Sequence, residues 1–128
     1  MKALLDTHAV VWAAESDSRL GSEASALLQS LKAGEAVISD LSLLEIAMLA
    51  KKGRVALRVP IRNYLNDLQK HFPVLPVTSD IAASAMELEL PPGDPFDRVI
   101  VATARHHKLP LLTRDRNIVA SGLVRTVW

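Results

Sequence analysis

The stretch Lys2-Ala-Leu-Leu-Asp6-Thr-His-Ala-Val-Val-Trp12 decides the fold of this chain. Lys2 to Leu5 form a short, mostly apolar run that stops at Asp6, and the segment from Ala9 continues with the apolar side chains of a helix. The order is therefore strand, acid, helix. We expect Asp6 to lie where the first strand leaves the core.

The same alternation of short strands and helices of about ten residues continues along the chain. No Asn-Gly hairpin signal interrupts it, so the strands are expected to be parallel. The pattern predicts a single α/β domain over residues 1–128, with three layers and a central sheet of four to five strands. The expected strands are 2–5, 36–39, 74–78, 110–113 and 123–128, and the expected helices are 9–14, 22–31, 41–52, 60–72, 79–88 and 94–104.

Composition narrows the possible chemistry. The chain has 128 residues, 49% of them hydrophobic, a formal net charge of +1 and no cysteine. This balance is typical of one globular domain, and the missing cysteines exclude a disulfide framework, a zinc ribbon and a thiol nucleophile. No apolar run reaches the roughly 18 residues of a membrane span, and no signal peptide is evident. We expect a cytoplasmic protein without membrane contact.

Two acids stand in places where apolar residues would be expected. Asp6 ends the first strand, at the edge where parallel sheets bind ligands, although a helix N-cap would also explain it. Glu45 replaces the missing member of an apolar series in its helix. A capping box starting at Ser42 is the alternative for Glu45, and we favour the functional interpretation. The apolar series consists of Leu41, Leu44, Met48 and Leu49.

Three further acids belong to the second half of the chain. Asp97 lies on one helix face with Ile100 and Val101, although a first-turn acid is also favoured by the helix dipole. Asp94 precedes Pro95, a common N-cap arrangement. Asp115 follows the strand ending at Thr113, where a turn acid is the ordinary explanation.

These acids could meet in one pocket, because strand ends and first helical turns share one sheet edge. Clustered carboxylates repel one another, so they must take up protons or bind a cation. Oxygen ligands favour Mg²⁺ or Mn²⁺ over Zn²⁺. Such a cation beside a hydroxyl such as that of Thr113 can activate water for hydrolysis of a phosphodiester.

Basic residues surround the last two acids. Arg98, Arg114 and Arg116 are candidates for binding a nucleic-acid backbone, with a solvated surface as the alternative. His8 lies near the predicted site, where a structural role is more common than acid–base catalysis. The sequence contains no zinc-protease, phosphate-loop or serine-hydrolase motif.

Four strings of the sequence match a known family in order and spacing. The sequence resembles the PIN-domain ribonucleases and, within them, the VapC toxins of bacterial toxin–antitoxin pairs, over essentially its whole length. The strings are Leu4-Leu-Asp6-Thr7-His8 with Trp12; Ile38-Ser39-x-x-Ser42-x-x-Glu45-Ile-Ala47; Gly93-Asp94-Pro-Phe-Asp97-Arg98 with Ile100 and Ala102; and Leu112-Thr113-x-Asp115.

The resemblance implies a metal-dependent endoribonuclease that hydrolyses RNA with a metal-activated water. Its acidic quartet would be Asp6, Glu45, Asp97 and Asp115 around Mg²⁺ or Mn²⁺, with Asp94, Thr113 and Thr7 as accessory residues. The resemblance also implies a homodimer silenced by a small VapB-like antitoxin. The helix of Glu45 is apolar on a second side, through Leu43, Ile46, Ala47 and Ala50, which is typical of deep burial or a partner surface.

Two other functions remain open at this point. A catalytically idle PIN-like module could bind RNA or protein on the same fold. A phosphoryl-accepting receiver domain is also a parallel α/β domain with acids at strand ends. Receivers need an acidic pair after the first strand, and Met1 to Asp6 contains no such pair.

Overall fold

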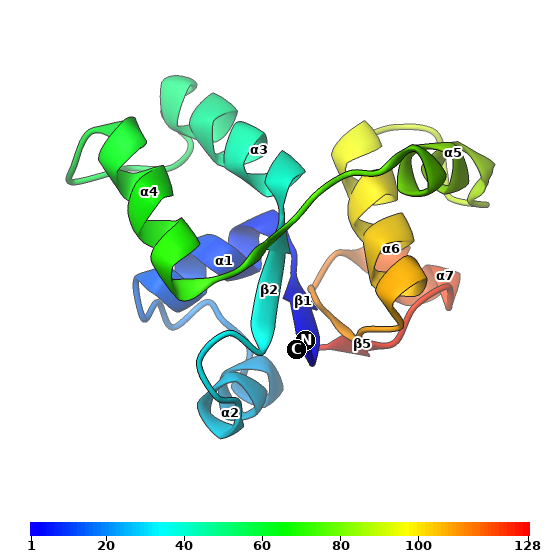
Figure 1. Cartoon of the computed structure of the whole chain (residues 1–128), viewed down its shortest axis with the longest axis horizontal. Helices are drawn as coiled ribbons and strands as arrows, with labels where there is room; N and C mark the ends of the chain where they lie inside the picture. Colours follow the sequence, from blue (N-terminus) through cyan, green and yellow to red (C-terminus); the bar gives the residue numbers. More distant parts are fainter.

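The computed structural model describes all 128 residues and contains a five-stranded parallel sheet. The strand order is β3-β2-β1-β4-β5, so the first strand lies at the centre, as Figure 1 shows. The strands are β1 (Ala3–Leu5), β2 (Ala36–Ser39), β3 (Val74–Leu75), β4 (Leu111–Leu112) and β5 (Thr126–Val127). The predicted parallel α/β architecture is confirmed, although β3, β4 and β5 are shorter than expected.

Seven helices flank the sheet. They are α1 (Thr7–Ala14), α2 (Ser22–Ser30), α3 (Asp40–Lys51), α4 (Ile61–His71), α5 (Ser79–Glu87), α6 (Pro95–His107) and α7 (Arg116–Ser121). Helices α1 to α4 lie to one side of the sheet, and α5 to α7 lie to the other (Figure 1). No helix combines the length and apolar character needed to cross a membrane.

The core has two halves because side chains alternate across each strand. Leu5 and Ile38 pack with the cluster beneath α1 to α4, whereas Leu4 and Val37 pack with α6 and α7. All four side chains are fully buried. The sheet is therefore covered on both faces, as a parallel sheet requires.

Several local expectations need correction. The cap of α2 is Gly21 rather than Ser22, and the cap of α5 is Thr78 rather than Ser79 or Asp80. The turn expected at Asp115 is the start of an additional helix, α7, whose six residues are too few to show an amphipathic pattern.

The packing of α3 differs from the predicted apolar series. Leu44 and Met48 are 53% and 37% exposed, so they do not belong to the core. Ile46 and Ser42 are buried instead. The helix starts at the N-cap Ser39, whose side chain accepts from the Leu41 N–H. Because the N-cap lies three residues before Ser42, the capping box alternative for Glu45 is wrong.

Candidate active site

Asp6 joins the central strand to the cavity. Its backbone N–H donates to the Leu112 carbonyl of β4 at 3.1 Å, which places it at the carboxyl edge of the sheet. Its Oδ1 accepts from the Ala9 N–H at 2.9 Å and so caps α1. The N-cap and the site interpretations are therefore compatible, because a carboxylate has a second oxygen free for another partner.

Glu45 reaches the same region from the middle of α3. The Thr7 hydroxyl donates to Glu45 Oε1 and lies 3.2 Å from the hydroxyl of Ser42. Since the Thr7 hydroxyl carries one proton, Ser42 acts as the donor in that second hydrogen bond. Thr7 and Ser42 are both buried, so this network fixes Glu45 against α1.

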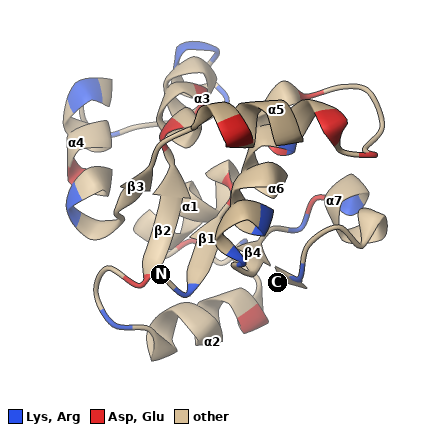
Figure 2. Ribbon diagram, turned by 45° about the vertical axis from the view of Figure 1, so that its right-hand side comes forward, with Lys and Arg blue, Asp and Glu red and all other residues tan.

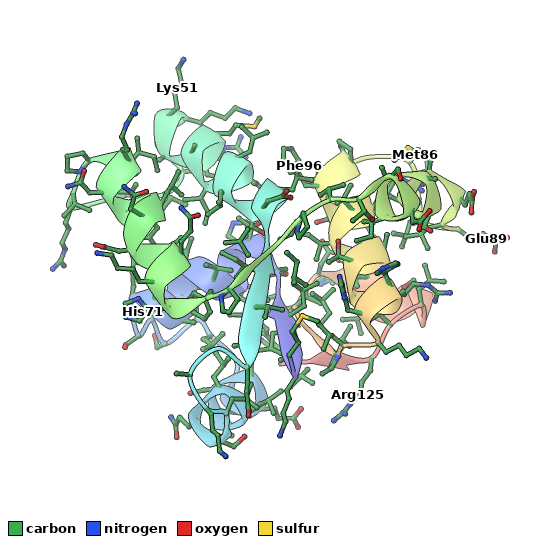
Figure 3. The ribbon with its side chains drawn as sticks, viewed as in Figure 1. Lys51, His71, Met86, Glu89, Phe96 and Arg125 are labelled. Atoms are coloured by element: carbon green, nitrogen blue, oxygen red, sulfur yellow. The ribbon has the colours of Figure 1, made fainter.

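The first turn of α6 provides two acids. Asp94 accepts from the Phe96 N–H at 2.8 Å, and Pro95 occupies the first helical position, as predicted. Asp97 lies in the first turn of the same helix. Phe96, the chain neighbour of Asp97, lies at the end of α6 that approaches α3 (Figure 3).

Asp115 completes the acidic set from beyond β4. It caps α7 by accepting from the Ile118 N–H at 3.0 Å. Its own N–H donates to the Thr113 hydroxyl at 3.1 Å, and Thr113 is fully buried. Thr113 therefore holds the backbone of Asp115 through its hydroxyl and does not itself line the cavity.

The five predicted acids line one cavity of about 580 Å³. Strand ends, helix starts and, for Glu45, the middle of α3 bring them together from four separate parts of the chain. Thr7 and Arg114 also line it, as expected. The remaining lining residues are His8, Val11, Trp12, Glu15, Arg19, Arg54, Val55, Ala56 and Trp128.

Burial and mutual repulsion raise the pKa values of three of these carboxylates. Burial, followed by repulsion from Asp94, Asp115, Glu45 and Asp6, raises the pKa of Asp97 to about 7. Burial also raises the pKa of Asp6 and of Glu45, and hydrogen bonds from Thr113 and Thr7, respectively, oppose those shifts. No ion pair joins any of these acids to a lysine or arginine. The negative charge of these acids is therefore not compensated by a direct ion pair within the protein.

The side chains surround the cavity but do not converge on a single point. No three acidic or histidine side chains are arranged as a ready-made metal site. Ligation of a cation by this set therefore requires the carboxylates to reorient.

Two of the three arginines proposed for RNA lie outside the cavity lining. The role expected for Arg98 does not fit its geometry, because its guanidinium donates to the carbonyls of Ala85, Leu88 and Leu90 at 2.7 to 3.2 Å. Arg98 thus ties α6 to the segment after α5. Arg116 is exposed at the start of α7, and its contact with RNA stays a prediction.

Apart from His8, the other lining residues were not predicted from the sequence to belong to the site. His8, Trp12 and Glu15 follow Asp6 on the cavity-facing side of α1, and their helical spacing was an available signal. Arg54 follows α3 in a loop marked by basic residues in Figure 2. Nothing in the sequence places Arg54, Arg19 or Trp128 at this site, because tertiary structure alone brings them there.

A parallel α/β domain with clustered carboxylates at the carboxyl edge of its sheet defines the class of protein. The chain belongs to the PIN domain family, whose profile matches residues 3–121. It is 36% identical to Ribonuclease VapC22 of Mycobacterium tuberculosis over 98% of this chain and 97% of that protein. Membership of this family sets the receiver domain aside.

Solved structures share the fold. The VapC20 toxin of Mycobacterium tuberculosis, described as cleaving the sarcin-ricin loop, has a TM-score of 0.70 at 20% identity, covering 99% of this chain and all of that one. A toxin–antitoxin complex from Klebsiella pneumoniae has a TM-score of 0.68 at 24% identity, covering 96% and 95% of the two chains. At these identities the likeness concerns the fold alone.

Proposed function

We propose that this protein is a metal-dependent endoribonuclease and the toxin of a VapBC-type toxin–antitoxin pair. One observation carries the proposal: the five predicted acids line a single cavity and form no ion pair with a lysine or arginine, in a PIN domain related to a named ribonuclease. Its substrate is RNA, which it would hydrolyse at internal phosphodiester bonds in the cytoplasm.

The donor set fits a hard divalent cation. Asp6, Glu45, Asp97 and Asp115 offer only oxygen ligands, and no cysteine is present to favour a softer metal. Burial raises the pKa of Asp6, Glu45 and Asp97, neighbouring carboxylates add to each rise, and a bound cation would favour their charged forms. Mg²⁺ or Mn²⁺ bound there would neutralise charge on the phosphodiester and lower the pKa of the attacking water.

The residues of this chain have distinct tasks in such a reaction. Asp6 and Asp115 each use one oxygen as a helix cap and keep the other for the site. Thr7 orients Glu45 through its hydroxyl. Asp97, whose pKa is about 7, is partly protonated at neutral pH, and it would have to be deprotonated to serve as a ligand of a cation. Asp94 adds negative charge beside Asp97 without being required as a ligand.

The partners follow from family membership. We infer a small VapB-like antitoxin and a homodimer, as the sequence analysis expected. The exposed Leu44 and Met48 on α3 offer apolar surface for one of these contacts, because they are neighbours on one helix face and covering them would remove apolar area from water.

Cleavage of cellular RNA tests the proposal. Purified protein should cut total RNA into discrete fragments with Mg²⁺ or Mn²⁺ and should stop when a chelator is added. Asp97→Asn should reduce the rate at least about a hundredfold, as expected for loss of a group that stabilises the transition state. Asp80→Asn is the matched control, since Asp80 is an exposed first-turn acid outside the cavity, and it should cleave like the parent.

The alternative function predicts a different result. An idle PIN-like module would bind RNA or protein without cleaving it under any metal condition. Cleavage by identically prepared Asp97→Asn at the rate of the parent would contradict the acidic-site mechanism.

A further inference from the structure

The cavity contains a second, cationic region besides its acids. Arg19, Arg54 and Arg114 line the same cavity as the five carboxylates, yet none of them forms an ion pair with those acids. Opposite charges that share a cavity usually pair unless other contacts hold them apart. Another contact must therefore hold these arginines away from the acids.

Trp12 provides that contact for Arg19 and Arg114. The guanidinium carbon of Arg114 lies 4.5 Å from the centroid of the Trp12 ring, and that of Arg19 lies 5.2 Å away. Both distances are within the range of a cation–π contact. Trp128 packs edge-on against Trp12 at 5.7 Å, and Trp12 is only 4% exposed. The indole is thus a fixed platform on which the arginines rest.

The two arginines on this platform differ in how much of their charge and hydrogen-bonding capacity remains free for a ligand. Arg19 donates from Nε and Nη2 to both carboxylate oxygens of Asp17, so its charge is compensated locally. Arg114 has no acidic partner and no hydrogen bond within the protein. A guanidinium stacked on an indole keeps its N–H edge free, and that edge matches a phosphate.

The two regions lie along one helix. Asp6 caps α1 at its acidic end and Trp12 lies six residues further on, a rise of about 9 Å along the helix axis. A strand of RNA that places one phosphate among the acids would therefore extend toward the platform with its neighbouring phosphates.

We propose that Arg114, seated on Trp12, binds a phosphate of the RNA strand adjacent to the one that is cleaved. Trp12 is a positioning residue that keeps Arg114 away from the acids. This inference rests on the proposed ribonuclease function and adds to it a binding subsite with defined residues.

Binding measured without cleavage tests the subsite. In an Asp97→Asn background, a fluorescein-labelled single-stranded RNA is titrated and its anisotropy recorded at several salt concentrations. Arg114→Ala should weaken binding about tenfold and lower the salt slope by about 0.7, the value for loss of one phosphate contact on a single strand. Arg125→Ala is the control, since Arg125 is an exposed arginine that forms no ion pair and points away from the body of the molecule (Figure 3). It should change binding less than twofold.

The platform is tested separately. Trp12→Leu should weaken binding about as much as Arg114→Ala, and the double variant should be no weaker than either, because both remove one contact. Trp12→Phe keeps a ring face and should restore most of the affinity, which also covers the case in which Trp12→Leu fails to fold. In the otherwise unchanged enzyme, Arg114→Ala should raise KM while kcat stays within about threefold.

The outcomes separate this inference from the proposed function. Equal effects of Arg114→Ala and Arg125→Ala, with RNA cleavage by the parent intact, would overturn the subsite alone. A parent protein that cleaves no RNA would overturn the ribonuclease function, and a loss of RNA binding specific to Arg114→Ala would then support the subsite in a binding protein.

Discussion

The Thr7 hydroxyl donates a hydrogen bond to Glu45, a residue 38 positions away on a different helix. This contact connects the first turn of α1 to the middle of α3, and Ser42 supports it from one turn earlier on α3. The orientation of Glu45 is therefore set by α1, whose cap is Asp6. The start of α1 thus positions two of the acids, Asp6 as its cap and Glu45 through Thr7.

Replacing Thr7 tests this positioning. Thr7→Val has nearly the same shape but no hydroxyl, so Glu45 loses its donor and becomes free to rotate. We expect kcat to fall about tenfold, which corresponds to roughly 1.4 kcal/mol, the net strength of one hydrogen bond to a charged group. Thr7→Ser keeps the hydroxyl and should stay within about threefold of the parent. Equal rates for the valine and serine variants would contradict this role.

The raised pKa of Asp97 makes stability depend on pH. Its pKa is about 7 in the folded protein and near 3.8 in the unfolded chain, so the folded state binds more protons between these values. The free energy of unfolding should therefore fall as pH rises from about 4 to 7. Asp97→Asn lacks this carboxylate, so its free energy of unfolding should not fall in this way. The variant should be equal to the parent in stability near pH 4 and about 1–2 kcal/mol more stable at pH 8. The difference is smaller than the full pKa shift would give, because Asp97 is partly exposed and solvent screens its charge.

Urea unfolding in chelator at pH 4, 6 and 8 measures this difference. Asp80→Asn should show no pH-dependent gain. Added Mg²⁺ should raise the stability of the parent at pH 8 more than that of Asp97→Asn, because binding to the folded state alone stabilises it. A stability difference that does not change with pH would contradict the assignment of the shift to Asp97.

Arg98 is expected to act on stability rather than on RNA. Arg98→Ala leaves three carbonyls without their shared charged donor, so it should lower the free energy of unfolding by about 2–3 kcal/mol. Arg98→Lys retains the charge but not the planar fork and should recover only part of that loss. Thermal unfolding measures both variants, and RNA affinity per folded molecule should remain unchanged. A stable Arg98→Ala protein with weakened RNA binding would reverse this assignment.

Gly21 is required by its close approach to Trp128. A Cβ at position 21 would lie 2.4 Å from the backbone carbonyl carbon of Trp128 and 2.5 Å from its ring, and neither distance is tolerable. The φ of Gly21 is −61°, so contact and not conformation excludes a side chain. Gly21→Ala should cost about 1–3 kcal/mol, the usual range for overpacking. Its neighbour Ser22 is exposed, and Ser22→Ala should change stability by less than about 0.5 kcal/mol in the same urea titration.

Local sequence signals anticipated the strands and the six longer helices because each carries its own pattern. Leu4 and Leu5 are apolar on consecutive positions, as a strand buried on both faces requires. Helix caps were displaced by one residue at Gly21 and Thr78. At Thr78 a neighbouring hydroxyl fulfils the role expected of Ser79, whereas Gly21 makes no side-chain cap hydrogen bond that a sequence signal could indicate. Leu44 and Met48 are exposed although their spacing on α3 is that of a core face, because spacing indicates that a face is apolar and not that it is covered.

The acidic half of the site was predictable, and the cationic half was not. Asp6 and Asp115 follow strands, and the carboxyl ends of parallel strands share one edge, so their meeting follows from topology. Arg19 and Trp128 come from opposite ends of the chain and meet only through the packing of Trp12. Arg114 was identified for its charge, whereas its seat on an indole depends on that packing.

Asp6, Asp94 and Asp115 start three helices with the same carboxylates that line the cavity. Fraying of the first turn of α1, α6 or α7 would therefore disassemble the site while most of the fold persisted. Such local openings need less free energy than global unfolding. Activity should accordingly be lost on warming before the tertiary structure melts. Loss of activity would then indicate that the first turns of these helices have opened.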